Sequence, residues 1–173
     1  MPIQEPGPNQ VQIKVHSAML NPSDILFMRG KYNVRLKYPY TPGWEGSGTV
    51  VKAGPGMMAQ WLVGKRVAFN KQFEILTFKM GGSMADYIVT DVKSIIPIGD
   101  DITLEQAAGL FVNPLTALGM VDRCKELRAK AIIVTAAASQ IGRMIIKLCK
   151  QEGITPICTV RREAQVEFLQ KEL

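Results

Sequence analysis

Residues 131–142 read Ala-Ile-Ile-Val-Thr-Ala-Ala-Ala-Ser-Gln-Ile-Gly, and this stretch decides the fold. Its first five residues form a short apolar run, as in a buried parallel strand, and a tight run of small residues follows. Apolar residues then recur at helical spacing, at Ile141, Ile145 and Leu148, up to a helix-ending Gly153. A second apolar run covers residues 154–160. Strand, turn, helix and strand in this order predict a βαβ unit.

The small-residue turn is a degenerate form of the G-x-G-x-x-G fingerprint of dinucleotide-binding folds. Its three positions are Ala137, Ser139 and Gly142, so only the last keeps its glycine, where the helix packs closely on the strand. Alanine and serine are still small enough to let a pyrophosphate approach the helix N-terminus, where free N–H groups favour anions. In a plainer interpretation, Ser139 caps the helix and the unit binds no nucleotide. The turn alone leaves both interpretations open.

The end of the second predicted strand favours NADP over NAD. An acidic residue about twenty positions past the glycines holds the ribose 2′-hydroxyl of NAD. This chain has Arg161 and Arg162 there, and guanidinium groups suit a 2′-phosphate. A solvated basic pair before a helix is the alternative, and the neighbouring Glu163 keeps NAD possible. We therefore expect NADPH as the cofactor.

Composition excludes several classes of function. The 173 residues are 47% hydrophobic, which predicts a soluble globular protein, and no run approaches the roughly 18 apolar residues that span a bilayer. The net charge is +6, but the basic residues are dispersed, which argues against nucleic acid. Cys124, Cys149 and Cys158 lack metal-type spacing, so we expect reduced, buried thiols in an intracellular protein, cytoplasmic or mitochondrial. No membrane or nucleic-acid partner is expected.

The end of the sequence suggests a fragment. Val166, Leu169 and Leu173 follow a helical pattern that stops midway. A doubly wound sheet normally has about six strands, and only two are predicted here. Two parallel strands with an open edge bury little apolar surface. We therefore expect these residues in isolation to aggregate, to bind NADPH poorly, or to need a further segment.

The preceding part of the chain is predicted to be rich in short strands. Val11, Ile13 and Val15 alternate with polar residues up to His16, which ends the run and is the single histidine, expected to be structural. A short helix is expected over residues 21–30, with Asn21 or Ser23 as its cap. Turn signals then separate further strands. These strands are expected within residues 49–51, 64–69 and 81–89, with no clear pattern over residues 71–80.

Helical signals take over after residue 100. Thr103 and Gln106 form a capping box, and Asn113 followed by Pro114 predicts a second helix with Asn113 as N-cap and Pro114 at its first position. The change from strands to helices predicts a domain boundary here, with residues 1–112 in one domain and residues 113–173 in the next.

Five motifs in order resemble one superfamily. The chain resembles the medium-chain dehydrogenase/reductase superfamily, and within it the zinc-free branch of quinone oxidoreductases and 2-enoyl thioester reductases. The resemblance implies an α/β fold: a GroES-like β-barrel catalytic domain followed by the beginning of an NADP-binding Rossmann domain. The motifs are Asn-Pro-Ser-Asp at 21–24, Pro-Gly-Trp-Glu-Gly-Ser-Gly at 42–48, Gly-Lys-Arg-Val at 64–67, Gly-Ser-Met-Ala-Asp-Tyr at 82–87 and Ala-Ala-Ala-Ser-Gln-Ile-Gly at 136–142.

The chain departs from the zinc alcohol dehydrogenases at both metal positions. Those enzymes have a cysteine where Asn21 stands and a histidine where Trp44 stands, and one histidine with three scattered cysteines cannot build their zinc sites. We expect no metal. Hydride addition to a conjugated C=C bond requires only a hydrogen-bond donor for the carbonyl oxygen and a weak acid. By resemblance to mitochondrial-type enoyl reductases, Tyr32 is the catalytic residue; a loop tyrosine that merely packs its ring is the alternative.

The resemblance also implies which residues bind the cofactor. Asn113 and Thr116 stand where the superfamily places the nicotinamide end, and Arg161 with Arg162 would meet the 2′-phosphate. The pyrophosphate would lie against the turn. The turn residues are Ala138, Ser139, Gln140, Ile141 and Gly142.

The resemblance therefore predicts a zinc-independent, NADPH-dependent oxidoreductase that reduces a small-molecule enone, enoyl thioester or quinone by hydride transfer. A homodimer is expected for the full-length protein. One rival is a one-electron quinone reductase in which Tyr32 plays no part. Another is a non-catalytic nucleotide-binding or scaffold member, which the Ala- and Ser-substituted turn would fit.

Overall fold

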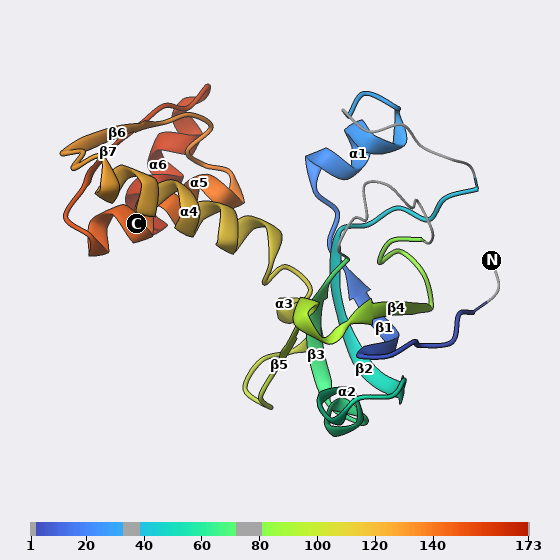
Figure 1. Cartoon of the computed structure of the whole chain (residues 1–173). Coiled ribbons are helices and arrows are strands. Elements are labelled where there is room, and N and C mark those ends of the chain that lie inside the picture. Colours follow the sequence, from blue (N-terminus) through green and yellow to red (C-terminus); the bar gives the residue numbers. More distant parts are fainter. Residues whose placement is uncertain (1–2, 33–38, 72–80, 173) are drawn as a thin grey trace. The chain divides into compact units, whose positions relative to one another are not determined.

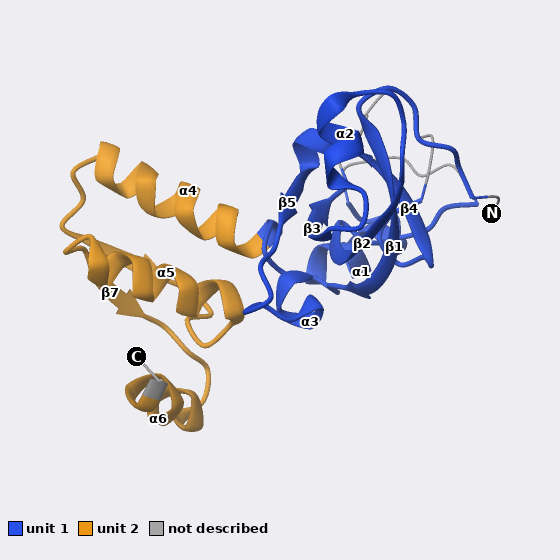
Figure 2. Ribbon diagram, turned by 90° about the horizontal axis from the view of Figure 1, so that it is seen from below, with its two compact units in different colours: residues 1–112 blue, residues 113–173 orange. Residues whose placement is uncertain are grey.

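The computed structural model describes residues 3–32, 39–71 and 81–172 (Figure 1). Residues 72–80, which belong to the stretch without a clear sequence pattern, and Leu173 of the final helical pattern lie outside the described residues. The chain divides into two compact units, residues 1–112 and residues 113–173 (Figure 2). No helix in the described ranges is long and apolar enough to cross a bilayer.

Among the described residues, the first unit is built on a five-stranded antiparallel sheet. Its strands are β1 (Gln10–Ala18), β2 (Glu45–Ala53), β3 (Arg66–Asn70), β4 (Tyr87–Asp91) and β5 (Ile95–Pro97), in the order β4-β1-β2-β3-β5. Alternation places Val11 and Ile13 of β1 in the core, where Val50, Val67 and Phe69 meet them. The predicted α/β class with a β-rich first domain is confirmed.

Short helices complete the first unit. The sequence pattern predicts no helix at α2 (Met57–Leu62), whose buried Ala59 and Leu62 join the core of the sheet. The expected short helix is α1 (Pro22–Met28). The expected capping box opens α3 (Leu104–Ala107), where Gln106 N–H donates to Thr103 Oγ1 over 3.2 Å. A 3₁₀ turn, η1 (Val92–Ser94), lies between β4 and β5.

Two strands are longer than their patterns predicted. Strand β1 does not end at His16 but continues to Ala18, and β2 begins at Glu45 rather than Thr49. The added residues pair with each other, Ala18 opposite Gly46. A Cβ at Gly46 would lie 2.7 Å from the Ser17 carbonyl oxygen. A glycine occupies this position of the strand because the neighbouring backbone lies too close for a side chain.

The second unit contains the predicted βαβ arrangement. Strands β6 (Ala131–Val134) and β7 (Thr155–Cys158) pair in parallel, and α5 (Gln140–Gln151) connects them. Ile145, Ile146 and Cys149 of α5 are buried with Val134 of β6. Helix α6 (Glu163–Glu172) follows β7, and α4 (Val112–Glu126) contributes Ala117 and Val121 to the same core.

The start of α4 corrects one prediction. The helix begins at Val112, so Asn113 lies inside its first turn and is not the N-cap, and Pro114 is not at the first position. The peptide N–H groups of Phe111 and Val112 instead donate to the side chain of Glu45, a residue far away in sequence. A distant carboxylate has taken the capping role that the local pattern assigned to Asn113.

Candidate functional site

The small-residue turn between β6 and α5 is tightly built. Ala136 has a φ of +49°, in the left-handed region, and the Ala137 N–H donates to Thr159 O over 3.2 Å. A Cβ on Gly142 would lie 2.6 Å from the Ala137 carbonyl oxygen, 2.8 Å from Ala137 Cα and 2.9 Å from Ala136 O. These are backbone atoms, which cannot move easily to relieve such contacts. The single retained glycine is therefore required by the close approach of the turn to α5.

Ser139 caps α5, as the plainer interpretation of the turn expected. Its Oγ accepts from the Gly142 N–H over 3.1 Å. Ser139 and Gln140 are exposed, while Ala138 and Ile141 are half-buried. The turn thus presents small or polar groups beside the N-terminus of a twelve-residue helix, where the first N–H groups have no partner within the helix and attract anions.

The structure brings Asn113, a predicted cofactor residue, next to the small-residue turn. Asn113 Nδ2 on the first turn of α4 donates to Gln140 Oε1 at the start of α5, over 3.4 Å. Thr116 directly precedes the buried Ala117 on α4 and is itself exposed. Asn113 and the turn residue Gln140 are therefore neighbours within the second unit.

Arg161 and Arg162 lie in the bend between β7 and α6. Both are exposed, and the Arg161 N–H donates to Gln165 Oε1 over 3.1 Å, which fixes the bend at the start of α6. Neither guanidinium group forms an ion pair with any residue in the described ranges. Within the described residues, both positive charges are therefore exposed and have no ion-pair partner.

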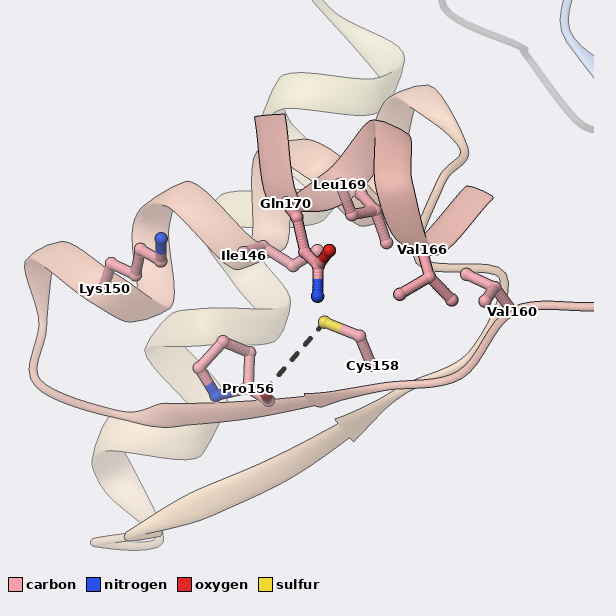
Figure 3. A pocket seen from close by; sticks show the side chains of 8 residues that line it. All are labelled: Ile146, Lys150, Pro156, Cys158, Val160, Val166, Leu169 and Gln170. Atoms are coloured by element: carbon pink, nitrogen blue, oxygen red, sulfur yellow. Dashed lines mark hydrogen bonds between the residues drawn. The ribbon is translucent and has the colours of Figure 1, made fainter. Parts of the chain in front are cut away.

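The second unit also has an apolar pocket of about 410 Å³ between α5, β7 and α6 (Figure 3). None of the predicted cofactor residues lines it. Cys158 points into it, which corrects the expectation of three buried thiols: Cys149 is buried, Cys124 is half-buried and Cys158 is exposed. Its apolar strand position suggested burial, but the side chain faces a pocket that α6 does not fill.

Tyr32 belongs to the first unit, in a cluster of aromatic rings. Its ring centroid lies 5.5 Å from that of Trp44 and 6.3 Å from that of Phe27, in tilted and edge-on arrangements. Phe27 is only 1% exposed, whereas Tyr32 is 41% exposed. Ring packing therefore holds one side of the tyrosine while the residue remains open to solvent.

Two fully buried carboxylates, Asp24 and Glu45, occupy the same unit, and sequence reasoning assigned neither a role. Asp24 Oδ2 accepts from the Asn21 N–H over 2.7 Å. Burial raises the pKa of Asp24 above its ordinary value and nearby Glu45 adds to this, against the lowering by peptide N–H groups. Burial, followed by the charge of Asp24, raises the pKa of Tyr40 to about 12.

Glu45 has a hydrogen-bond donor for each oxygen. Its Oε1 accepts from Asn21 Nδ2 over 3.1 Å, and its Oε2 accepts from the N–H groups of Phe111 and Val112 over 2.9 and 2.8 Å. The available signal was an acidic residue between an aromatic residue and a glycine, four positions before the strand expected at residues 49–51. That signal indicates a buried charge but does not identify its partners.

The residues at the two metal positions make other contacts. The Asn21 amide donates to Glu45, and the Trp44 ring lies against Phe27 with centroids 5.1 Å apart. Among the described residues, no group of three or more His, Cys, Asp or Glu side chains could hold a metal ion.

Comparison with known proteins gives consistent matches. A family model described as the alcohol dehydrogenase GroES-like domain matches residues 7–100. The mitochondrial enoyl-[acyl-carrier-protein] reductase of Caenorhabditis elegans is 33% identical over 171 residues, which are 98% of this chain and 46% of that protein. Quinone oxidoreductase-like protein 2 of Rattus norvegicus is 35% identical over 141 residues, 81% of this chain and 38% of that protein.

Among solved structures, a putative NADPH:quinone reductase from Mesorhizobium loti superposes with a TM-score of 0.86 at 43% sequence identity, over 98% of this chain and 48% of that one. The chain thus spans about half the length, or less, of the proteins it matches.

Proposed function

The chain belongs to the alcohol dehydrogenase GroES-like family within the medium-chain dehydrogenase/reductase superfamily, and from this we propose that the protein is a zinc-independent, NADPH-dependent oxidoreductase. Its substrate is a small molecule with an activated C=C bond or a quinone, reduced by hydride transfer. The observation that carries the proposal is the tight turn closed by Gly142 at the N-terminus of α5. Relatives named as enoyl reductases and quinone oxidoreductases support it.

The residues of the second unit fit a dinucleotide. The missing Cβ at Gly142 lets the turn approach α5 closely, and the small side chains of Ala138 and Ser139 leave room for a pyrophosphate beside helix N–H groups. Gln140 and Ile141 complete that turn, and Asn113 with Thr116 would hold the nicotinamide end. Bound NADPH supplies the hydride. The exposed guanidinium groups of Arg161 and Arg162 would bind the 2′-phosphate, which distinguishes NADPH from NADH.

Tyr32 is the proposed acid. Reduction of a conjugated C=C bond adds a hydride at the β-carbon and a proton at the α-carbon, and negative charge gathers on the carbonyl oxygen in between. The Tyr32 hydroxyl can donate a hydrogen bond to that oxygen without being charged beforehand. Ring contacts with Trp44 and Phe27 restrict the orientation of this exposed phenol, as a positioned donor requires.

A scaffold or nucleotide-binding role without catalysis is the second candidate. One observation favours it: Ser139 Oγ accepts from the Gly142 N–H, a donor that a phosphate could otherwise use. In the remaining rival, a one-electron quinone reductase, the packing of Tyr32 is purely structural.

Titration of the complete protein with NADPH and with NADH, followed by nicotinamide fluorescence, tests the cofactor. Tighter binding of NADPH is expected, and no binding of either would favour the scaffold.

We also propose an intracellular site of action, cytoplasmic or mitochondrial, and a homodimer; the C. elegans relative is named as mitochondrial.

Substitution of the proposed acid tests the reaction. Tyr32→Phe should lower turnover of an enone or enoyl thioester by roughly 10²–10⁴, the usual contribution of a positioned acid, and leave quinone reduction nearly intact. Tyr40→Phe is the matched control, because it removes a phenol from the same ring cluster. Equal loss of both activities in Tyr32→Phe, or equal effects of the two variants, would contradict the assigned role.

A further inference from the structure

Glu45 is a fully buried carboxylate that joins two distant parts of the first unit. It is the first residue of β2, and its Oε2 accepts from two successive peptide N–H groups, those of Phe111 and Val112, 66 and 67 residues later. A buried charge is strongly disfavoured unless hydrogen bonds satisfy it. The side chain and these two N–H groups therefore hold one another in a single arrangement.

The bonds lie at the point where α4 begins. Val112 is the first residue of α4, and N–H groups at a helix start lack partners within the helix. Glu45 supplies their acceptor. The adjacent Asn113 is thereby not used as a cap, and its amide donates to Gln140 instead.

We propose that Glu45 is a positioning residue for the nicotinamide end of the cofactor. It fixes the residue at which α4 starts, and so the position of Asn113 and Thr116 on the first turns of that helix. This inference rests on the proposed function, in which these two residues hold the nicotinamide. Glu45 acts through them and does not itself touch cofactor or substrate.

Two variants separate the reach of the side chain from its charge. Glu45→Gln loses the charge but keeps the reach: its carbonyl oxygen can replace Oε2, and its NH₂ group can face the Asn21 amide after that amide turns over. Glu45→Asp keeps the charge but withdraws the oxygens by one methylene. A positioning role depends on reach, whereas an electrostatic role depends on charge.

Ser47→Ala is the matched control. Ser47 lies two residues along the same strand, is fully buried, and donates to the carbonyl oxygen of Leu104 in α3. Its loss removes a comparably buried bond between side chain and backbone without touching residues 111–112. If a general loss of stability weakened NADPH binding, Ser47→Ala should weaken it too.

The experiment measures the NADPH dissociation constant, the thermal midpoint, and amide hydrogen exchange at Phe111 and Val112 in the complete protein. Glu45→Asp should weaken NADPH binding about tenfold, the equivalent of roughly one lost hydrogen bond, and speed exchange at both amides. Glu45→Gln should stay within about twofold of the wild type. Ser47→Ala should lower the midpoint and leave the dissociation constant unchanged.

Three results would overturn the inference while the proposed function stands: unchanged affinity in both Glu45 variants, weaker binding in Glu45→Gln but not Glu45→Asp, or equal weakening in Ser47→Ala. A wild-type protein that binds no NADPH would overturn the proposed function, and this inference with it.

Discussion

Replacing Gly142 by alanine tests the geometry of the turn directly. The added Cβ would lie 2.6 Å from Ala137 O and 2.8 Å from Ala137 Cα, closer than such atoms approach in folded proteins. Both neighbours are backbone atoms between β6 and α5, so relief requires the turn to move away from the helix. Gly119, in the middle of α4, has nothing within 4 Å of the corresponding position and provides the control.

The two substitutions should have opposite signs. Overpacking costs about 1–3 kcal/mol, and alanine in a helix recovers up to about 1 kcal/mol relative to glycine. Because the clash is with backbone, we expect Gly142→Ala to destabilise by about 1–2 kcal/mol, a fall in Tm of about 2–8 °C for a chain of this size. Gly119→Ala incurs no clash and should stabilise by about 0.5–1 kcal/mol.

Thermal and urea unfolding of the two variants beside the wild type measures these differences, and NADPH titration shows whether the displaced turn also loses the cofactor. Weaker NADPH binding is expected for Gly142→Ala alone. If Gly142→Ala were as stable as Gly119→Ala and bound NADPH as the wild type does, the close approach of the turn to α5 would not have the importance assigned to it.

Two more predictions concern buried groups. Burial raises the folded-state pKa of Asp24 above its ordinary 3.8, so its stabilising contribution is complete below that value and is lost as the pH rises through the folded-state pKa. Asp24→Asn should therefore flatten the decline in unfolding free energy over that range, measured by urea titration at several pH values; an unchanged slope would contradict this. Cys158 should react with a thiol reagent in the native protein and Cys149 only after unfolding, as mass spectrometry of modified peptides would show. Equal early modification of both would refute the assigned burial.

Local patterns were enough to predict several features. Apolar spacing and the small-residue run gave β6, α5 and β7, because each depends on residues close together in sequence. The capping box of Thr103 and Gln106 is likewise contained in four residues, and the structure has both of its bonds. These features have a period or a spacing that a single chain displays directly.

The features that were missed depend on distant partners. Glu45 caps the start of α4 from more than sixty residues away, and a local pattern cannot show such a partner. The N-cap role was therefore predicted for the nearby Asn113, which lies inside the helix. The early start of β2 was missed because the Ser17 carbonyl, which requires a glycine at position 46, belongs to another strand. Tyr32, Asn113 and Thr116 were assigned by resemblance, and the turn and the arginine pair by their pattern as well. All these roles stay predictions until the variants are measured.

The placement of the first sheet within the chain has a consequence for synthesis. Every strand of that sheet lies between Gln10 and Pro97, so a ribosome that has released this stretch has produced all the material the sheet needs. The donors for Glu45 Oε2, at Phe111 and Val112, are translated afterwards. We therefore expect the Glu45 carboxylate to keep its bound water in the nascent chain until Phe111 and Val112 have been synthesised.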